Sequence, residues 1–116
     1  KYQEAPQVLR EKQINLLQEI KWICRKHDTD VKIIISPDYL QVNINPADVK
    51  TLKRFFGKRN VFDFTGINEY TEDIHNYYEP GHYRPALGKR LMEKIYEPYI
   101  LSPNAKSPAS PSPGTI

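Results

Sequence analysis

The sequence is poor in cysteine, in long apolar runs and in excess charge. Its single cysteine, Cys24, excludes an internal disulfide framework and a zinc site made of several thiolates. No segment approaches the roughly 20 apolar residues of a membrane-spanning helix. The sequence also lacks the basic start followed by an apolar run that is typical of a secretory signal. Because 17 Lys and Arg face 14 Asp and Glu, the net charge is only +3 and does not by itself indicate a partner.

The only basic cluster of the sequence consists of Lys50, Lys53, Arg54, Lys58 and Arg59. A nucleic-acid-binding protein usually has a denser basic stripe with aromatic residues or a groove-reading motif beside it. We therefore interpret this cluster as a solvated helix face and expect no nucleic-acid partner.

A length of 116 residues fits one domain at most. Residues 102–116 contain four prolines and four serines, so this segment has almost nothing to bury and is predicted to be a flexible tail. The folded part is therefore expected to end near residue 101.

Apolar residues at three- and four-residue steps predict a helix over residues 7–27. The stripe expected to be buried consists of Leu9, Leu16, Ile20, Ile23, Cys24 and His27. We expect Trp22 to be half-buried and His27 to interact with the negative end of the helix. The next run, residues 31–36, is rich in β-branched residues and ends before Pro37, which is typical of a strand covered on both faces of a parallel sheet.

A second helix is predicted to start at Asn45 and Pro46. Asn45 can cap free backbone N–H groups, and proline needs no hydrogen bond at the first helical position. Asp48 suits the positive end of this helix, and Gly57 is a natural terminator. The buried stripe is expected to be Val49, Leu52, Phe55 and Phe56.

Residues 61–64 follow as a second strand, and residues 85–97 as a last helix that ends at Pro98. Leu87, Leu91 and Ile95 are expected to face the core of the protein. A strand, a helix and a strand in succession predict parallel pairing through a crossover connection. The predicted fold class is α/β: the C-terminal part of a flavodoxin-like three-layer sheet with parallel strands, followed by a C-terminal helix.

The central strand at residues 31–36 has apolar residues on both faces but at most one neighbouring strand within the sequence. An exposed apolar strand edge is an aggregation hazard, and the chain opens at Lys1, without an initiator Met and already close to a helix. We therefore expect residues 1–101 to be the C-terminal segment of a larger domain, completed by the remainder of that domain or by another chain.

In open α/β sheets, ligands bind beyond the carboxyl ends of the strands. The second strand leads into an irregular segment, residues 65–84, which carries Asp73, His75, Glu79 and His82. Glu79 lies three residues before His82, so its carboxylate can bind one ring nitrogen and leave the other to take a proton from a serine. Pro80 and Gly81 are expected to form a tight turn between them.

The order of these elements, with Glu-x-x-His just before the last helix, resembles the C-terminal half of the SGNH hydrolases, also called GDSL-type esterases and lipases. The resemblance covers roughly residues 7–97. It implies that His82 is the general base and Glu79 its orienting carboxylate, although the family usually has Asp at that position. The reaction implied is ester hydrolysis or acyl transfer on an ester or an acylated carbohydrate, without a metal or organic cofactor, and a location in the bacterial cell envelope fits this resemblance.

The serine block and the oxyanion-hole residues of that family are absent from the sequence, so the chain alone is not expected to hydrolyse an ester. Tyr78, Tyr83 and Arg84 are weaker candidates for substrate binding; Arg84 could instead pair with Glu79. A metal cluster of His75, Glu79 and His82 is disfavoured because its spacing is not that of helical zinc sites. The alternative function is a non-catalytic α/β module that binds a glycan or a protein partner at the same edge.

Overall fold

In the computed structural model of the chain, residues 1–97 are described; the tail predicted at 102–116 and the helix end predicted at Pro98 lie outside them. The helices are α1 (Glu11–Lys26), α2 (Pro46–Phe56) and α3 (Pro85–Ile95), with short 3-10 turns η1 (Lys58–Asn60) and η2 (Ile74–Asn76). Within residues 1–97, no helix combines the length and the apolar character needed to cross a bilayer.

The strands pair two by two. Strand β2 (Ile33–Ile35) lies parallel to β4 (Val61–Asp63), as predicted, and β1 (Gln3–Glu4) lies parallel to β3 (Val42–Asn43). Strands β5 (Tyr77–Glu79) and β6 (His82–Tyr83) form an antiparallel hairpin. The α/β class with parallel strand pairs is confirmed, and residues 1–97 form three two-stranded sheets.

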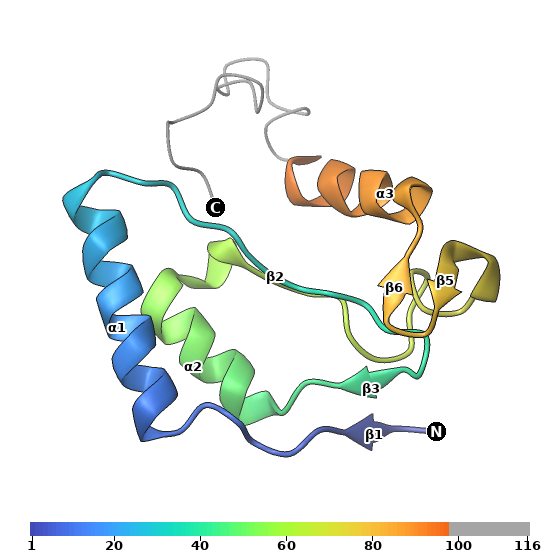
Figure 1. Cartoon of the computed structure of the whole chain (residues 1–116), viewed down its shortest axis with the longest axis horizontal. Helices are drawn as coiled ribbons and strands as arrows, with labels where there is room; N and C mark the ends of the chain where they lie inside the picture. The colour runs from blue at the N-terminus through green and yellow to red at the C-terminus, as the bar shows by residue number, and fades with distance from the viewer. Residues whose placement is uncertain (98–116) are drawn as a thin grey trace.

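Helices cover both faces of the β2–β4 pair (Figure 1). Ile33 and Ile35 contact a core between α1 and α2 that contains Cys24, Val31, Leu52, Phe56 and Val61. Ile34 and Phe62 point to the other face, where they contact the core beneath α3, formed by Phe64, Leu91 and Ile95. Successive strand residues alternate between the two cores because side chains alternate across a pleated strand.

The first helix begins later than predicted, at Glu11 instead of residue 7. The backbone N–H groups of Val8 and Leu9 donate to the carboxylate of Asp48, at 2.9 and 3.1 Å, so this segment is held by α2 instead of extending α1. Asp48 is only 1% exposed. The sequence predicted the position of Asp48 at the positive end of α2, but it did not predict the hydrogen bonds of Asp48 with Val8 and Leu9.

The predicted buried stripe of α1 was wrong for most of its members. Cys24 is buried, but Leu16, Ile20 and Ile23 are 58%, 41% and 50% exposed. Trp22, expected to be half-buried, is 62% exposed. The apolar arc of α1 is wider than the part that α2 covers, and we call its uncovered part, Leu16, Ile20 and Ile23, the α1 stripe.

The start and the end of α2 are as predicted. The side chain of Asn45 accepts a hydrogen bond from the N–H of Ala47 at 2.9 Å, and Pro46 is the first helical residue. Gly57 ends the helix with φ of +92°, a conformation that favours glycine. Leu52 and Phe56 are buried as expected, whereas Val49 and Phe55 are half-buried.

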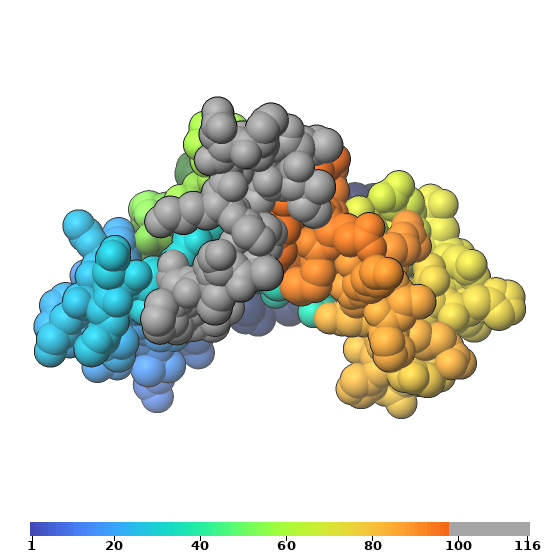
Figure 2. Space-filling view, turned by 90° about the horizontal axis from the view of Figure 1, so that it is seen from above, coloured from blue at the N-terminus to red at the C-terminus, as the bar shows by residue number. Residues whose placement is uncertain are grey.

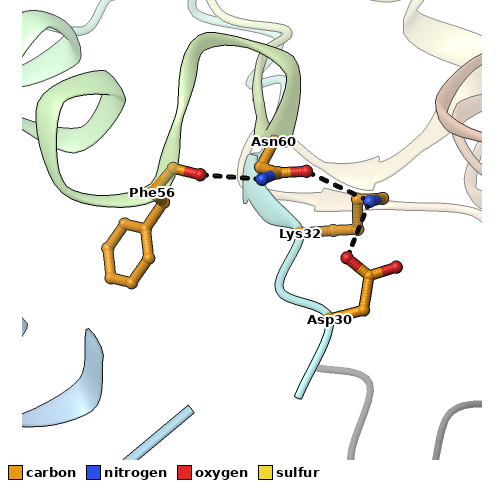
Figure 3. A network of polar contacts seen from close by, with 4 residues as sticks. All are labelled: Asp30, Lys32, Phe56 and Asn60. Atoms are coloured by element: carbon orange, nitrogen blue, oxygen red, sulfur yellow. Dashed lines mark hydrogen bonds and ion pairs between the residues drawn. The ribbon is translucent and has the colours of Figure 1, made fainter. Parts of the chain in front are cut away.

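A polar network fastens the end of α2 to the segment that enters β2 (Figure 3). The ammonium group of Lys32 donates to Asp30 Oδ1 at 3.4 Å and to Asn60 Oδ1 at 3.1 Å, and Asn60 Nδ2 donates to the carbonyl of Phe56 at 2.7 Å. Lys32 is 8% exposed, so these bonds compensate for the desolvation of a buried charge.

Helix α3 buries Leu87, Leu91 and Ile95 at 0%, 0% and 1% exposure, which confirms the predicted stripe. The three positions are four residues apart and share one helix face. Tyr83 of β6, two residues before α3, packs against the same core, which ties this end of the hairpin to α3.

Candidate functional site

The segment after β4, predicted to be irregular, contains η2 and the β5–β6 hairpin. Tyr77 pairs with Tyr83 and Glu79 with His82, and Pro80 and Gly81 form the connection between the two strands. The predicted turn at Pro80 and Gly81 is therefore confirmed, but the strands on either side of it were missed. An aromatic pair beside a Pro-Gly turn is the sequence signal that indicates such a hairpin.

Glu79 and His82 face one another across this turn. His82 Nδ1 lies 2.5 Å from Glu79 Oε1, and the two side chains are 75% and 62% exposed, respectively. In the tautomer with the proton on Nδ1, this nitrogen donates to the carboxylate, and Nε2 is the nitrogen left to accept a proton. The carboxylate would also stabilise the imidazolium that forms when Nε2 accepts that proton.

The hairpin turn lies against the segment that follows β2. The N–H of Tyr39 donates to the carbonyl of Pro80 at 2.9 Å, and the rings of Tyr39 and Tyr77 lie 5.7 Å apart. A Cβ atom on Gly81 would come within 3.8 Å of Asp38 Oδ2. The Glu79–His82 pair and the carboxyl end of β2 are thus brought to the same edge of the molecule.

Asp38 and Tyr39 were not singled out in the sequence, although they adjoin the candidate site. The only signal available was their position directly after the predicted strand and Pro37. The contact of Tyr39 with the hairpin spans about forty residues of chain, from Tyr39 to Pro80, and has no local pattern.

Tyr78 and Arg84 form a stacked pair on the exposed side of the hairpin. The guanidinium carbon of Arg84 lies 4.4 Å from the centre of the Tyr78 ring, and Arg84 Nε donates to the carbonyl of Tyr77 at 3.3 Å. Among residues 1–97, Arg84 forms no ion pair with Glu79, so that alternative is not realised. Tyr83 is half-buried and packs against the core beneath α3.

Tyr77 is a structural residue of this edge. It is 4% exposed, and its hydroxyl donates to the carbonyl of Tyr70 at 2.6 Å. Burial, with a smaller contribution from the negative charge of Asp38, raises the pKa of the Tyr77 hydroxyl above its ordinary value.

His75 forms a separate pair with Asp73 and does not join His82. His75 Nδ1 lies 2.9 Å from Asp73 Oδ1, and the side chains are 89% and 59% exposed. Hydrogen bonds from the backbone N–H and the side chain of His75 lower the pKa of the Asp73 carboxyl. The residues described form no group of three or more His, Cys, Asp or Glu side chains that could hold a metal ion.

Comparison of the chain with protein-family models, with curated proteins and with solved structures finds no match. The geometry of the Glu79–His82 pair and its position in the fold are the features of the chain that point to a function.

Proposed function

We propose that this chain supplies the catalytic histidine and its carboxylate partner to an SGNH-type serine ester hydrolase or acyl transferase. The observation that carries the proposal is the Glu79–His82 contact of 2.5 Å, on a hairpin packed against the segment that follows β2. Parallel strands, a helix layer on each face and a site beyond a strand end are what a flavodoxin-like hydrolase domain requires.

In this mechanism, His82 Nε2 takes the proton of a serine hydroxyl as the serine oxygen attacks the acyl carbon. Glu79 keeps the Nδ1 proton in place and stabilises the positive charge on the ring. His82 then gives its proton to the departing alcohol oxygen, and in the second half-reaction it activates water or an acceptor alcohol in the same way.

The serine and the oxyanion hole would come from preceding strands of the same domain. Two features support such a completion: β2 and β4 pair with no further strand among residues 1–97, and the α1 stripe is uncovered. An additional strand beside β2 would satisfy its free edge, and the α1 stripe would cover that strand. Exclusion of water by the added layer would strengthen the Glu79–His82 interaction, which is weak when exposed.

The proposal is tested in the full-length protein by ester hydrolysis and by labelling with a fluorophosphonate. His82→Ala should lower kcat by about 10³-fold or more, and Glu79→Gln should lower it strongly while leaving KM nearly unchanged. Both variants should retain the far-UV circular dichroism of the wild type, because the two side chains are exposed.

The His75–Asp73 pair provides a matched control, since it is an exposed histidine–carboxylate contact on the same segment. His75→Ala and Asp73→Asn should leave the hydrolysis rate within about twofold of wild type. Near-normal turnover by His82→Ala would contradict the catalytic assignment. Absence of fluorophosphonate labelling in the full-length protein would favour the non-catalytic module that binds a glycan or a protein at this edge.

A further inference from the structure

A groove between α1 and α2 combines positive charge with aromatic side chains. Its volume is about 600 Å³, and it is lined by Gln18, Lys21, Trp22, Arg25, Lys26 and Phe55. This volume is in the range of sites that hold a small ligand or a few side chains of a partner. The lining contains three cations and no carboxylate.

The cations of the groove are held against its rings. Lys26 Nζ lies 5.0 Å from the centre of the Trp22 ring, and Lys21 Nζ lies 5.9 Å from that of Phe55. The guanidinium of Arg54 lies 5.5 Å from the same Phe55 ring. Cation–π contacts of this kind are weak at exposed sites, so the groove presents charges that are positioned but not neutralised.

On the α2 side, carboxylates do not balance this charge. On α1, Glu19 lies one helical turn before Trp22, but among residues 1–97 it forms no ion pair. Residues 49–60 contain five Lys and Arg and no Asp or Glu. Asp48, the nearest acidic residue before them, is buried against Val8 and Leu9. Among residues 1–97, the ion pairs formed involve none of the cations that line the groove.

The groove lies on a different side of α1 from the stripe that a completed sheet would cover. Gln18, Trp22 and Arg25 each follow a member of the α1 stripe by two residues. Two residues correspond to a rotation of about 200° around a helix. The groove therefore stays open when further strands are added beside β2.

The groove is also remote from the candidate active site. The region of α1 and the region of the hairpin lie at opposite ends of the molecule (Figure 2). Residues 61–83, which run from β4 to the end of the hairpin, contain five Asp and Glu and no Lys or Arg, and Arg84 follows them. Acidic residues thus predominate on this segment, so an anion attracted to the groove is not steered toward it.

We propose that the α1–α2 groove is a docking site for an acidic segment of a partner protein that carries apolar side chains between its carboxylates. Charge complementarity is the basis of this assignment: the carboxylates would pair with Arg25, Lys26 and Arg54. An apolar side chain of the partner would lie against Trp22 and Phe55 between the helices. Aromatic and arginine side chains are the residue types enriched at such interfaces.

A single-stranded nucleic acid fits the groove less well. A base stacks over the whole face of an aromatic ring, and cations already lie over the rings of Trp22 and Phe55. An aliphatic side chain is smaller and needs only the part of a ring that the cations leave uncovered. A membrane surface is flat, whereas the rings lie in a concave groove. Preferential binding of a nucleic acid or of a membrane would therefore contradict the proposal.

Trp22 is the only tryptophan of the chain, so its fluorescence reports on the groove directly. The probe is a short synthetic peptide of repeated Glu-Glu-Leu, with a Gln-Gln-Leu peptide, oligo(dT) and phosphatidylglycerol vesicles as comparisons. We expect a saturable change of Trp22 emission with the acidic peptide alone, and weaker binding as salt is added. No saturable change would overturn the proposal, and so would tighter binding of oligo(dT) or of vesicles.

Charge-reversal variants locate the site. Arg25→Glu with Lys26→Glu should weaken peptide binding by about tenfold, because two attractions become repulsions. Lys12→Glu with Lys89→Glu makes the same change of net charge at exposed positions outside the groove and should have little effect. Arg25→Gln with Lys26→Gln removes the two positive charges without adding negative ones, so it should weaken binding by an intermediate amount. This variant keeps the test valid if the charge reversal disturbs the end of α1. Equal weakening by both reversal pairs would show non-specific attraction and refute the assigned site.

Discussion

Replacement of Asp48 tests the contact that joins the N-terminal segment to the rest of the fold. The carboxylate is 1% exposed and accepts two backbone hydrogen bonds, from Val8 at 2.9 Å and from Leu9 at 3.1 Å. Asp48 also lies in the first turn of α2, where a negative charge is favourable. Asp48→Asn keeps the shape of the side chain and replaces one acceptor oxygen by an NH₂ group, which faces a backbone donor.

The expected cost follows from these contacts. Hydrogen bonds to a charged group contribute about 1.5–3 kcal/mol each, and the interaction with the helix end adds about 0.3–1 kcal/mol. Val8 is 59% exposed, so water can replace part of the lost bonding. We therefore expect Asp48→Asn to lower the free energy of unfolding by about 2 kcal/mol, and Asp48→Ala by about 3 kcal/mol.

Urea unfolding followed by circular dichroism measures this loss, and amide hydrogen exchange measures its location. The amides of Val8 and Leu9 should lose protection in the variant, while those of α3 change only with global stability. Asp28→Asn is the matched control, because Asp28 is exposed and has φ of +53°, which asparagine also tolerates. A loss below about 0.5 kcal/mol for Asp48→Asn, with protection of both amides unchanged, would refute the reasoning.

Two further changes test the other core and the hairpin. Leu91→Ala removes a side chain with 0% exposure and should lower the free energy of unfolding in urea by about 2–5 kcal/mol. Met92→Ala, at 42% exposure, should lower it much less. Equal losses for the two variants would contradict the packing of α3. Tyr77→Phe loses the hydrogen bond to Tyr70 and should cost about 1 kcal/mol at pH 7. Burial raises the pKa of the Tyr77 hydroxyl above 10.0, so wild-type stability should fall as pH rises past about 10, where the unfolded chain loses this proton first. Tyr77→Phe should make that fall less steep, and an unchanged slope between pH 8 and 11 would contradict this explanation.

Local signals made two of the helices predictable. Asn45 and Pro46 mark the start of α2, and the four-residue spacing of Leu87, Leu91 and Ile95 marks the buried face of α3. In each case the residues whose pattern predicts the helix are also the ones that cap it or pack its buried face. The prediction therefore needs no knowledge of the rest of the fold.

The exposed stripe of α1 and the pairing of β1 with β3 could not be predicted in this way. Periodicity identifies an apolar arc, but the part of the arc that is buried depends on where α2 packs. Strands β1 and β3 are two residues long and about forty residues apart in sequence, so neither propensity nor turn chemistry indicates their pairing. Long-range contacts of this kind have no local pattern.

The contact between Glu79 and His82 was predictable for the same reason as the start of α2. Glu79 and His82 are three residues apart with a turn between them, so their contact follows from local geometry. Asp38 and Tyr39 reach the same edge only through tertiary packing, which the sequence does not display.

The two cores on opposite faces of the β2–β4 pair have a consequence for how the chain opens. The strand residues between them alternate, with Ile33 and Ile35 packed against one core and Ile34 and Phe62 against the other. Each core is therefore a candidate for a separate cooperative unit, or foldon. Loss of α3 would remove the core against which Tyr83 of the hairpin packs, so that the hairpin would be held mainly by Tyr39 and Tyr70, while α1 and α2 kept their own contacts. Partial unfolding of the C-terminal unit would then loosen the candidate site and leave the α1–α2 groove intact.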